Sequence, residues 1–379
     1  MTPPPSLDLD ALLTDPAIHI VVCCGSGGVG KTTTAAALAL RAAEAGRRVV
    51  VLTIDPARRL AQSMGLSELD NSPRQVKGVD ATAGGELHAM MLDMKRTFDE
   101  VVLAHTDAAK AEEIFANPFY QAMSSSFSGT QEYMAMEKLG QLRAQDSEAE
   151  WDLIVVDTPP SRSALDFLDA PQRLARFLDG RLLRVLLMPA KTGGRGVLKV
   201  VSASFSMFTR VITKVVGAQL LEDISTFVSA LDSMFGGFRE RAQRTYDLLK
   251  TPGTAFLVVA APEPDALREA SYFAARLTEE EMPLSGLVLN RVHATAVDEV
   301  SVEQSVAGAE RLDQAGASPV TAHVLRLHAD LVRQVDRERR MAARFTSAHP
   351  GVPVVEIPAQ PDDIHDLDAL RRIVGGPFR

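Results

Sequence analysis

The sequence predicts an α/β fold built on a mostly parallel, doubly wound sheet into which helical material is inserted. Apolar runs of strand length alternate with stretches of helical periodicity along most of the 379 residues, which is the pattern of right-handed βαβ crossovers. The run 49–54 is apolar at nearly every position, as a strand covered by helices on both faces must be. Between residues 161 and 250 the strand signals stop, and only helical periodicity continues.

The elements follow one another in a regular order. We expect strands at 18–24, 49–54, 87–92, 152–156, 256–261, 286–291 and 352–357. We expect helices at 31–45, 262–281, 301–314, 321–347 and 363–374, and a helical stretch over 95–145 with breaks near 117–118 and 124–129. Residues 67–86 are polar and predict a loop. Residues 1–16 are rich in Pro and Asp and predict a flexible lead-in. Residues 17–379 then form a single domain whose helical subdomain comprises about 95–145 and 161–250.

The composition excludes several classes of protein. A net charge of −9 argues against a nucleic-acid partner, because neutralising phosphates needs a basic face. The first residues lack the basic and apolar regions of a secretory signal, and no apolar run is long enough to span a bilayer. We therefore expect a cytoplasmic protein without stable membrane insertion. The only cysteines, Cys23 and Cys24, are neighbours in the first strand and point to opposite faces, so we expect buried thiols and no disulfide.

Residues 25–32, GSGGVGKT, match the spacing G-x-x-x-x-G-K-[ST] of a phosphate-binding P-loop, and they lie between a predicted strand and a predicted helix. The glycines allow successive N–H groups to point at phosphate oxygens, and the helix adds the positive end of its dipole. Lys31 would bind the β- and γ-phosphates as a catalytic cation, and Thr32 would ligate Mg²⁺. We expect nucleotide contacts from Gly27, Gly28, Val29, Gly30, Lys31, Thr32 and Thr33. A glycine-rich turn without a ligand is the alternative.

Three polar residues that follow apolar strands complete the predicted site. Asp157 is placed to bind Mg²⁺ through water, because ligands of open α/β sheets bind at the carboxyl ends of strands. Asp55 also ends a strand, which we expect to neighbour the P-loop strand, and could orient a water for attack on the γ-phosphate. The amide of Asn290 can donate to and accept from an adenine edge. Ordinary turn chemistry is the alternative for each of the three.

These motifs together resemble the arsenite-pump ATPase family, which includes the ATPase that targets tail-anchored membrane proteins. Its members are P-loop NTPases with a deviant Walker A motif. The resemblance covers nearly the whole chain and rests on residues 25–32, 55–57, 129–132, 157–160 and 289–291. The run 21–28 is especially similar to the paired ATPases of this family from actinobacteria. The resemblance implies an ATP- and Mg²⁺-dependent dimer with switch segments near Asp55 and Asp157. It also implies an adenine site that uses Asn290 and the loops at Pro262 and Pro358.

The chain departs from the family pattern at three places. Ser26 stands where the family usually has a second lysine that reaches the partner's ATP, so hydrolysis by this chain alone is expected to be slow or to need a partner's cation. Arg162 and Ser163 stand where the second switch normally has Gly-His. With two core cysteines only, the chain lacks the thiolates for metalloid sensing and the zinc-binding cysteine pair of the tail-anchor branch.

The helical residues 198–238 permit two interpretations. Met207, Met234 and several phenylalanines suit an apolar groove for a transmembrane segment, as in the tail-anchor branch. The same residues can instead form the core of a helical subdomain, which is the interpretation that we favour. The sequence thus favours an ATPase switch that works as a homodimer, or as a heterodimer with a paralogous ATPase, on an apolar helix or membrane-protein client. A nucleotide-binding regulatory subunit of such a heterodimer is the alternative.

Overall fold

The structure, a computed structural model, divides the chain into two compact units. The first comprises Met1–Met91, Gln145–Leu165 and Leu248–Arg379, and the second comprises Leu92–Ala144 and Asp166–Asp247. The structure describes residues 5–55, 59–118, 120–121, 124, 130–144, 151–159, 240–295, 297 and 299–374. The expected switch residues Arg162 and Ser163 and the expected client groove at 198–238 lie outside these ranges.

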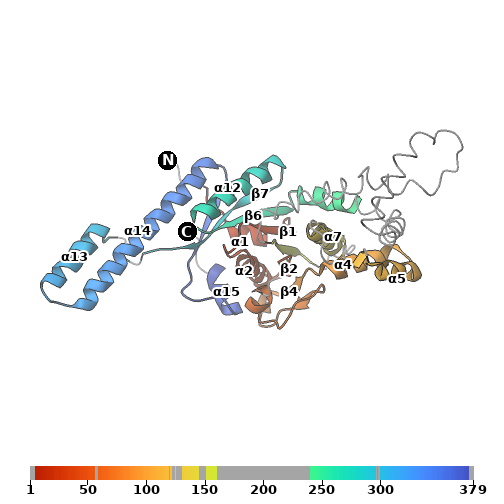
Figure 1. Cartoon of the computed structure of the whole chain (residues 1–379), viewed down its shortest axis with the longest axis horizontal. Coiled ribbons are helices and arrows are strands. Elements are labelled where there is room, and N and C mark those ends of the chain that lie inside the picture. Colours follow the sequence, from red (N-terminus) through yellow and green to blue (C-terminus); the bar gives the residue numbers. More distant parts are fainter. Residues whose placement is uncertain are drawn as a thin grey trace, which may run out of the picture. The chain divides into compact units, whose positions relative to one another are not determined.

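The first unit is built around an eight-stranded sheet with the order β3-β4-β2-β5-β1-β6-β7-β8 (Figure 1). The strands are β1 (Ile20–Cys24), β2 (Arg48–Thr53), β3 (Arg74–Gln75), β4 (Glu86–Met91), β5 (Leu153–Asp157), β6 (Thr254–Ala260), β7 (Leu284–Val292) and β8 (Val354–Pro358). Every neighbouring pair is parallel except β3 with β4. The predicted mostly parallel α/β fold is therefore confirmed, and each predicted strand is present.

The order of the central strands differs from one expectation. We expected the strand that precedes Asp55 to neighbour the P-loop strand, and this is wrong, because β5 lies between β2 and β1. β5 pairs with both neighbours, so that Asp157 lies opposite Cys23 on one side and Thr53 on the other. The strand that carries Asp157 is therefore central, and the Asp55 segment lies one strand further out.

The described part of the first unit also contains helices. They are α1 (Leu9–Thr14), α2 (Lys31–Glu44), α3 (Arg59–Ser63), α12 (Pro264–Glu279), α13 (Val302–Gln314), α14 (Pro319–Ala348) and α15 (Leu367–Val374). α2 is rich in Ala and Leu, which favour helix, and ten of its fourteen residues are buried. Gly46, in the left-handed region at φ 102°, ends the turn after it. α2 thereby holds the P-loop against the middle of the sheet.

Residues 5–16 are ordered, so the expected flexible lead-in is wrong for this part of the chain. The Asp8 side chain accepts a hydrogen bond from the N–H of Ala11 and caps α1, whose Leu9 and Leu13 are fully buried. The guanidinium of Arg41 on α2 forms a bidentate pair with Asp10, with contacts of 2.8 and 2.7 Å. The proline-rich composition concealed this short amphipathic helix.

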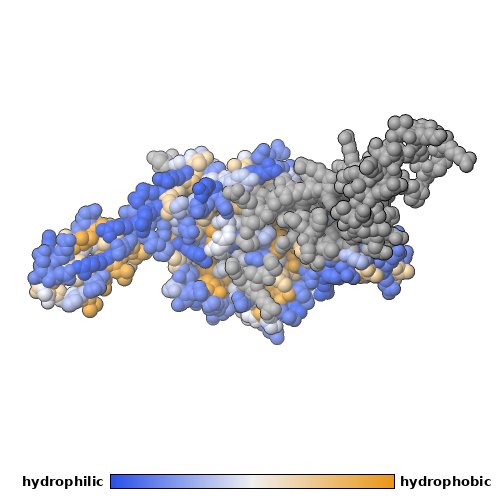
Figure 2. Space-filling model, in the orientation of Figure 1, coloured by the Kyte–Doolittle hydropathy of each residue, from blue (hydrophilic) through white to orange (hydrophobic). Residues whose placement is uncertain are grey.

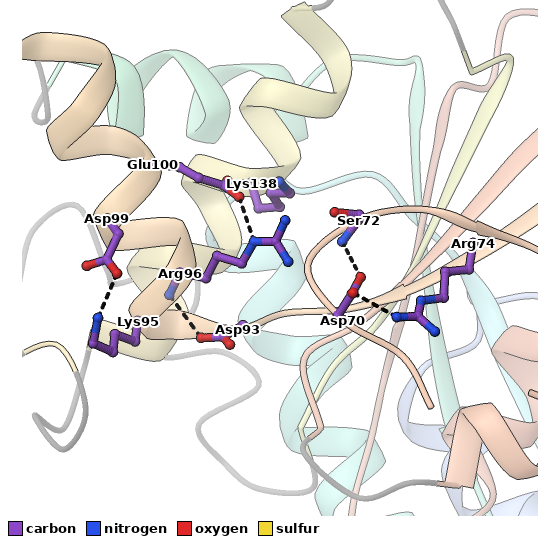
Figure 3. A network of polar contacts seen from close by, with 9 residues as sticks. All are labelled: Asp70, Ser72, Arg74, Asp93, Lys95, Arg96, Asp99, Glu100 and Lys138. Carbon is purple, nitrogen blue, oxygen red and sulfur yellow. Dashed lines mark hydrogen bonds and ion pairs between the residues drawn. The ribbon is translucent and has the colours of Figure 1, made fainter. Parts of the chain in front are cut away.

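The segment predicted as a loop at 67–86 contains β3 and the single 3₁₀ turn Ala81–Ala83. Asp70 begins it with an Asx turn, in which its carboxylate accepts from the N–H of Ser72 at 2.9 Å and from Arg74 at 2.9 Å (Figure 3). β3 then pairs antiparallel with β4, with Arg74 opposite Ala89 and Gln75 opposite His88.

The described part of the second unit is helical, with α4 (Met94–His105), α5 (Ala108–Ala116) and α7 (Thr130–Ala144). The Asp93 side chain caps α4 by accepting from the N–H of Arg96, and Glu100 of α4 meets Lys138 of α7 at 3.2 Å (Figure 3). The sequence did not predict the break between α4 and α5, where Asp107 caps the new helix.

α13 and α14 form a helical hairpin that extends away from the sheet of the first unit (Figure 1). A capping box of Ser301 and Gln304 begins α13, and an ion pair between Asp313 and Arg326 joins the two helices. In Figure 2 the surface of this hairpin is largely hydrophilic, with apolar patches toward its far end. None of the helices that the structure describes is both long and apolar enough to cross a membrane.

Candidate nucleotide site at the carboxyl edge of the sheet

The P-loop follows β1 and requires glycine at two of its positions. Gly25 has φ 152°, and a Cβ there would lie 2.1 Å from the carbonyl oxygen of Val259 on β6. Gly30 has φ 91°, and a Cβ there would lie 2.3 Å from Nδ2 of Asn290. At these two positions the loop backbone therefore passes so close to its neighbours that a side chain does not fit.

Lys31 is buried, with 5% of its surface exposed, although it carries the charge of the P-loop. Its Nζ donates to the main-chain carbonyl of Ser26 at 2.7 Å, within the same loop. Burial lowers the pKa of the lysine, while the nearby carboxylates of Asp157 and Asp55 and the Cys24 thiol act in the opposite direction. The ammonium is thus held at the loop by a neutral acceptor and by neighbouring negative charge.

Asp157 ends β5 and is completely buried. Its Oδ2 accepts from the Thr53 hydroxyl at 2.8 Å, whereas Oδ1 has no hydrogen-bond partner among the described residues. Burial raises the pKa of this carboxyl to about 6, against the opposing effects of the Thr53 and Thr32 hydroxyls and of Lys31. A buried carboxylate oxygen without a partner, beside the P-loop lysine and threonine, is what Mg²⁺ binding through water requires, so these residues fit that ion.

Thr53 is the residue of the site that sequence reasoning missed. Its hydroxyl donates to Asp157 and accepts from the N–H of Asp55 at 3.2 Å, so one side chain joins the two predicted switch residues. Thr53 and Asp157 are paired across β2 and β5 in the parallel register. A polar residue at the last position of an apolar strand can indicate a site residue. This signal could be used only with the knowledge that β2 neighbours β5. Asp55 itself is 9% exposed.

The cysteines and Thr158 stabilise the floor of the site. The Thr158 hydroxyl donates to the carbonyl of Cys23 at 2.8 Å and ties the end of β5 to β1. Both thiols are free and fully buried, and burial raises the pKa of Cys24 to about 12 and that of Cys23 well above its ordinary value. Thiols that stay protonated in a core strand contribute packing and are unsuited to metal or redox chemistry.

Asn290 and Pro358 line one cavity with Gly30 and Thr33, and its volume is about 890 Å³. The Asn290 Nδ2 donates to the carbonyl of Val29 at 2.8 Å, so this side chain is bonded to the P-loop itself. Pro262 lines a separate cavity of about 540 Å³, so the structure does not bring it together with Asn290 and Pro358. The wall of the first cavity continues through residues 359–365, a polar segment that sequence reasoning did not single out.

Arg291 and His293 line both cavities. Arg291 has φ 62°, the left-handed region that costs an arginine about 1–2 kcal/mol, and the register of β7 with β8 shifts between Asn290 and Val292. This β-bulge changes the direction of successive side chains of β7 at the edge of the cavity that Asn290 and Pro358 line. Backbone strain of this kind commonly occurs at functional sites.

Comparison with known proteins agrees with this geometry. The profile of the anion-transporting ATPase family matches residues 18–314, which include the P-loop, Asp55, Asp157 and Asn290. The chain belongs to this family. It is an ATP-hydrolysing enzyme with the family's α/β fold, and the resemblance to the arsenite-pump ATPases is confirmed.

Three relatives illustrate the distance within the family. The chain is 24% identical to ATPase ASNA1 homolog 1 of Paramecium tetraurelia over 285 residues, which cover 75% of this chain and 78% of the relative. It is 27% identical to ATPase GET3B of Arabidopsis thaliana over 286 residues, 71% of this chain and 62% of the relative. It is 25% identical to ATPase GET3 of Ajellomyces dermatitidis over 291 residues, 75% and 76% of the two chains. All three are named as ATPases.

Proposed function

We propose that this protein is a Mg²⁺-dependent ATPase switch, in which ATP binding and hydrolysis close and open a dimer that handles a protein client. The observation that carries the proposal is the partnerless Oδ1 of buried Asp157 beside Lys31 and Thr32. An ionised carboxylate at this depth is unfavourable unless a cation completes it. Mg²⁺, when bound, would neutralise charge that develops on the phosphates.

The chain's own groups divide the remaining work. The amides of residues 27–33 bind phosphate oxygens, and Lys31 exchanges the carbonyl of Ser26 for the β- and γ-phosphates. Thr32 and Asp157 hold the magnesium ion, the latter through water. Asp55 positions the attacking water, and its backbone link to Thr53 relays a change at the γ-phosphate to the strand β2.

Adenine binds in the cavity of about 890 Å³, large enough for a nucleoside. Asn290 recognises its edge and Pro358 contacts its face, while Pro262 lines the second cavity, which shares Arg291 and His293 with this one. Binding requires Asn290 either to keep its bond to the carbonyl of Val29 or to exchange it for the base. The site is therefore adjusted by the nucleotide and not filled passively.

The dimer is a homodimer or a heterodimer with a paralogous ATPase, it acts in the cytoplasm, and its client is an apolar helix or a membrane protein. This part of the proposal is supported by the relatives named GET3 and ASNA1 and by the family resemblance. The uncharged Ser26 favours a second function, the nucleotide-binding subunit of a heterodimer that hydrolyses ATP slowly alone. No nucleic-acid partner is proposed, in keeping with the net charge of −9.

The primary test measures Mg²⁺-dependent ATP binding by calorimetry and phosphate release by the purified protein. Lys31→Ala should weaken ATP binding by at least about tenfold, because it removes a charge-assisted contact to the phosphates. Lys77→Ala, which removes an exposed lysine of the same unit, is the matched control and should bind as the unmodified protein does. Equal ATP affinity in both variants would refute the proposal.

The heterodimer alternative is tested by turnover. Phosphate release is compared for the protein alone, for Ser26→Lys, and for a mixture with the paralogous ATPase. Stimulation by the paralogue or by the new lysine supports the regulatory-subunit reading. Full turnover by the isolated homodimer, unchanged by either addition, removes it.

A further inference from the structure

The second cavity, of about 540 Å³, is lined by an unusual number of guanidinium groups. Arg337, Arg340 and Arg344 come from one face of α14, at the spacing that places side chains one above another on a helix, and Arg291 faces them from the β7 bulge. The loop 261–264 before α12 closes the remaining side. The four arginines thus belong to two elements and converge on one hollow.

These arginines differ from Arg326 and Arg333 of the same helix. Toward the start of α14, Arg326 pairs with Asp313 and Arg333 pairs with Asp330. The four arginines of the cavity form no ion pair or hydrogen bond with any residue that the structure describes. The two paired arginines therefore lie closer to the start of α14 than the arginines of the cavity.

The carboxylates of the cavity do not neutralise this charge. Glu338 is 6% exposed, and both its oxygens are already occupied. Oε2 accepts from the N–H of His293 at 2.9 Å, and Oε1 contacts Nδ1 of His293 at 2.8 Å and accepts from Gln334 at 3.1 Å. Glu263, the other carboxylate of the wall, is exposed and forms the N-cap position of α12. Two carboxylates, one of them fully engaged, face four guanidinium groups.

The concentration of positive charge is not a consequence of composition. The chain has 40 Lys and Arg residues against 49 Asp and Glu, and its net charge is −9. Like charges three and four residues apart on a helix destabilise it. The four guanidinium groups are exposed and have no carboxylate partner among the described residues, so they are available to an anion from solution.

We propose that this cavity binds a small, multiply charged anion that carries phosphate or carboxylate groups. Guanidinium forks bind both groups through two parallel hydrogen bonds, which is the geometry that Arg supplies and Lys does not. The volume admits one small molecule. Arg291 and His293 also line the proposed nucleotide cavity, so an anion bound here acts on the edge of that cavity. This coupling rests on the proposed nucleotide site, whereas the binding of the anion does not.

The test uses isothermal titration of the full chain with inorganic tripolyphosphate and, in a second arm, with citrate. Tripolyphosphate also suits the P-loop, so the titrations are repeated in Lys31→Ala. In that background Arg337→Gln/Arg340→Gln should weaken binding by at least about tenfold. Arg326→Gln/Arg333→Gln removes the same charge from paired positions of the same helix and should change the affinity by less than about twofold. Tighter binding of one probe assigns the ligand to the phosphate or the carboxylate class.

The two proposals fail differently in this design. If the P-loop does not bind phosphates, Lys31→Ala leaves the number of tripolyphosphate sites unchanged, whatever the α14 variants do. If the basic cavity is not an anion site, the two double variants bind both probes with equal affinity, and this result overturns the inference. Circular dichroism and the thermal midpoint verify that each variant is folded. If this face is instead a dimer contact, the double variant changes the mass measured by light scattering and no anion binds, and this result also overturns the inference.

Discussion

Replacing Asp157 with asparagine separates two consequences of one buried charge. The substitution keeps the size of the side chain and an oxygen that can accept from Thr53, but it removes the negative charge that Mg²⁺ requires. We expect Asp157→Asn to lose Mg²⁺-dependent hydrolysis. We also expect the same variant, without nucleotide, to be more stable than the unmodified protein at pH 7.5, because an ionised carboxylate is no longer buried.

The magnitude follows from the pKa of the carboxyl, which burial raises from 3.8 to about 6. Between these values the folded protein holds a proton that the unfolded chain has released, so its stability falls as the pH rises through this window. Above about pH 6 both states are ionised and the loss is complete. At about 1.4 kcal/mol per pH unit the loss amounts to about 3 kcal/mol. This loss is the upper limit of the stability that Asp157→Asn can gain. If the new amide N–H lacks an acceptor, the gain is smaller than the limit by about 1–3 kcal/mol.

Urea unfolding followed by tryptophan fluorescence measures this change in stability in the first compact unit, which contains Asp157. Trp151 is the sole tryptophan, is 6% exposed, and lies with its ring centroid 4.9 Å from that of His88, immediately before β5. The stability gain of Asp157→Asn should be present at pH 7.5 and should disappear near pH 4. Asp152→Asn, at the other end of the strand, removes a half-buried carboxylate that accepts from the N–H of Arg48 and should bring no gain. A gain that persists unchanged at pH 4 would refute the burial argument.

Three further predictions concern the surroundings of the site. Thr53→Val removes a hydroxyl that lowers the pKa of the Asp157 carboxyl, which we propose to bind magnesium. The acid limb of the pH profile of kcat/KM should therefore move to higher pH, and Thr53→Ser should restore it; an unmoved limb contradicts this role. Gly30→Ala places a Cβ against the Asn290 amide and should abolish ATP binding. Gly28→Ala is strained at φ 79° but has no neighbour within 4 Å, so it should retain ATP binding. Equal affinities of the two variants in a nucleotide titration contradict the steric argument. Arg291→Gly relieves the left-handed φ of 62° and should exceed Arg291→Ala in stability by about 1 kcal/mol in urea; equal midpoints contradict the strain.

The sequence predicted the sheet and the P-loop because their signals are local. An apolar run reports burial on both faces without knowledge of its partner, and the P-loop depends on residues 25–32 and their two flanking elements. The end of each strand was accurate to within about two residues for the same reason. Topology was less accessible, since nothing within β2 or β5 states which of them lies beside β1.

Apart from the local break between α4 and α5, the features that the sequence did not predict depend on long-range pairing. Thr53 gains its role from Asp157, 104 residues away, and Arg291 from a register shift between β7 and β8. α1 was overlooked because its stabilising partner, Arg41, lies on another helix and the composition of residues 1–16 resembles that of a disordered segment. Each of these residues is ordinary when considered alone and becomes informative only beside its partner.

The polar groups predicted to bind the nucleotide are already bonded to the P-loop backbone. Lys31 donates to the carbonyl of Ser26, and Asn290 donates to the carbonyl of Val29. A nucleotide bound as we propose would exchange hydrogen bonds at this site, and its affinity would be less than the sum of its contacts suggests. Because Lys31 uses the carbonyl of Ser26 and not the hydroxyl, Ser26→Lys leaves that bond available and adds a cation to the loop. Any gain in turnover in that variant then reports the missing second charge, and not a disturbance of the first.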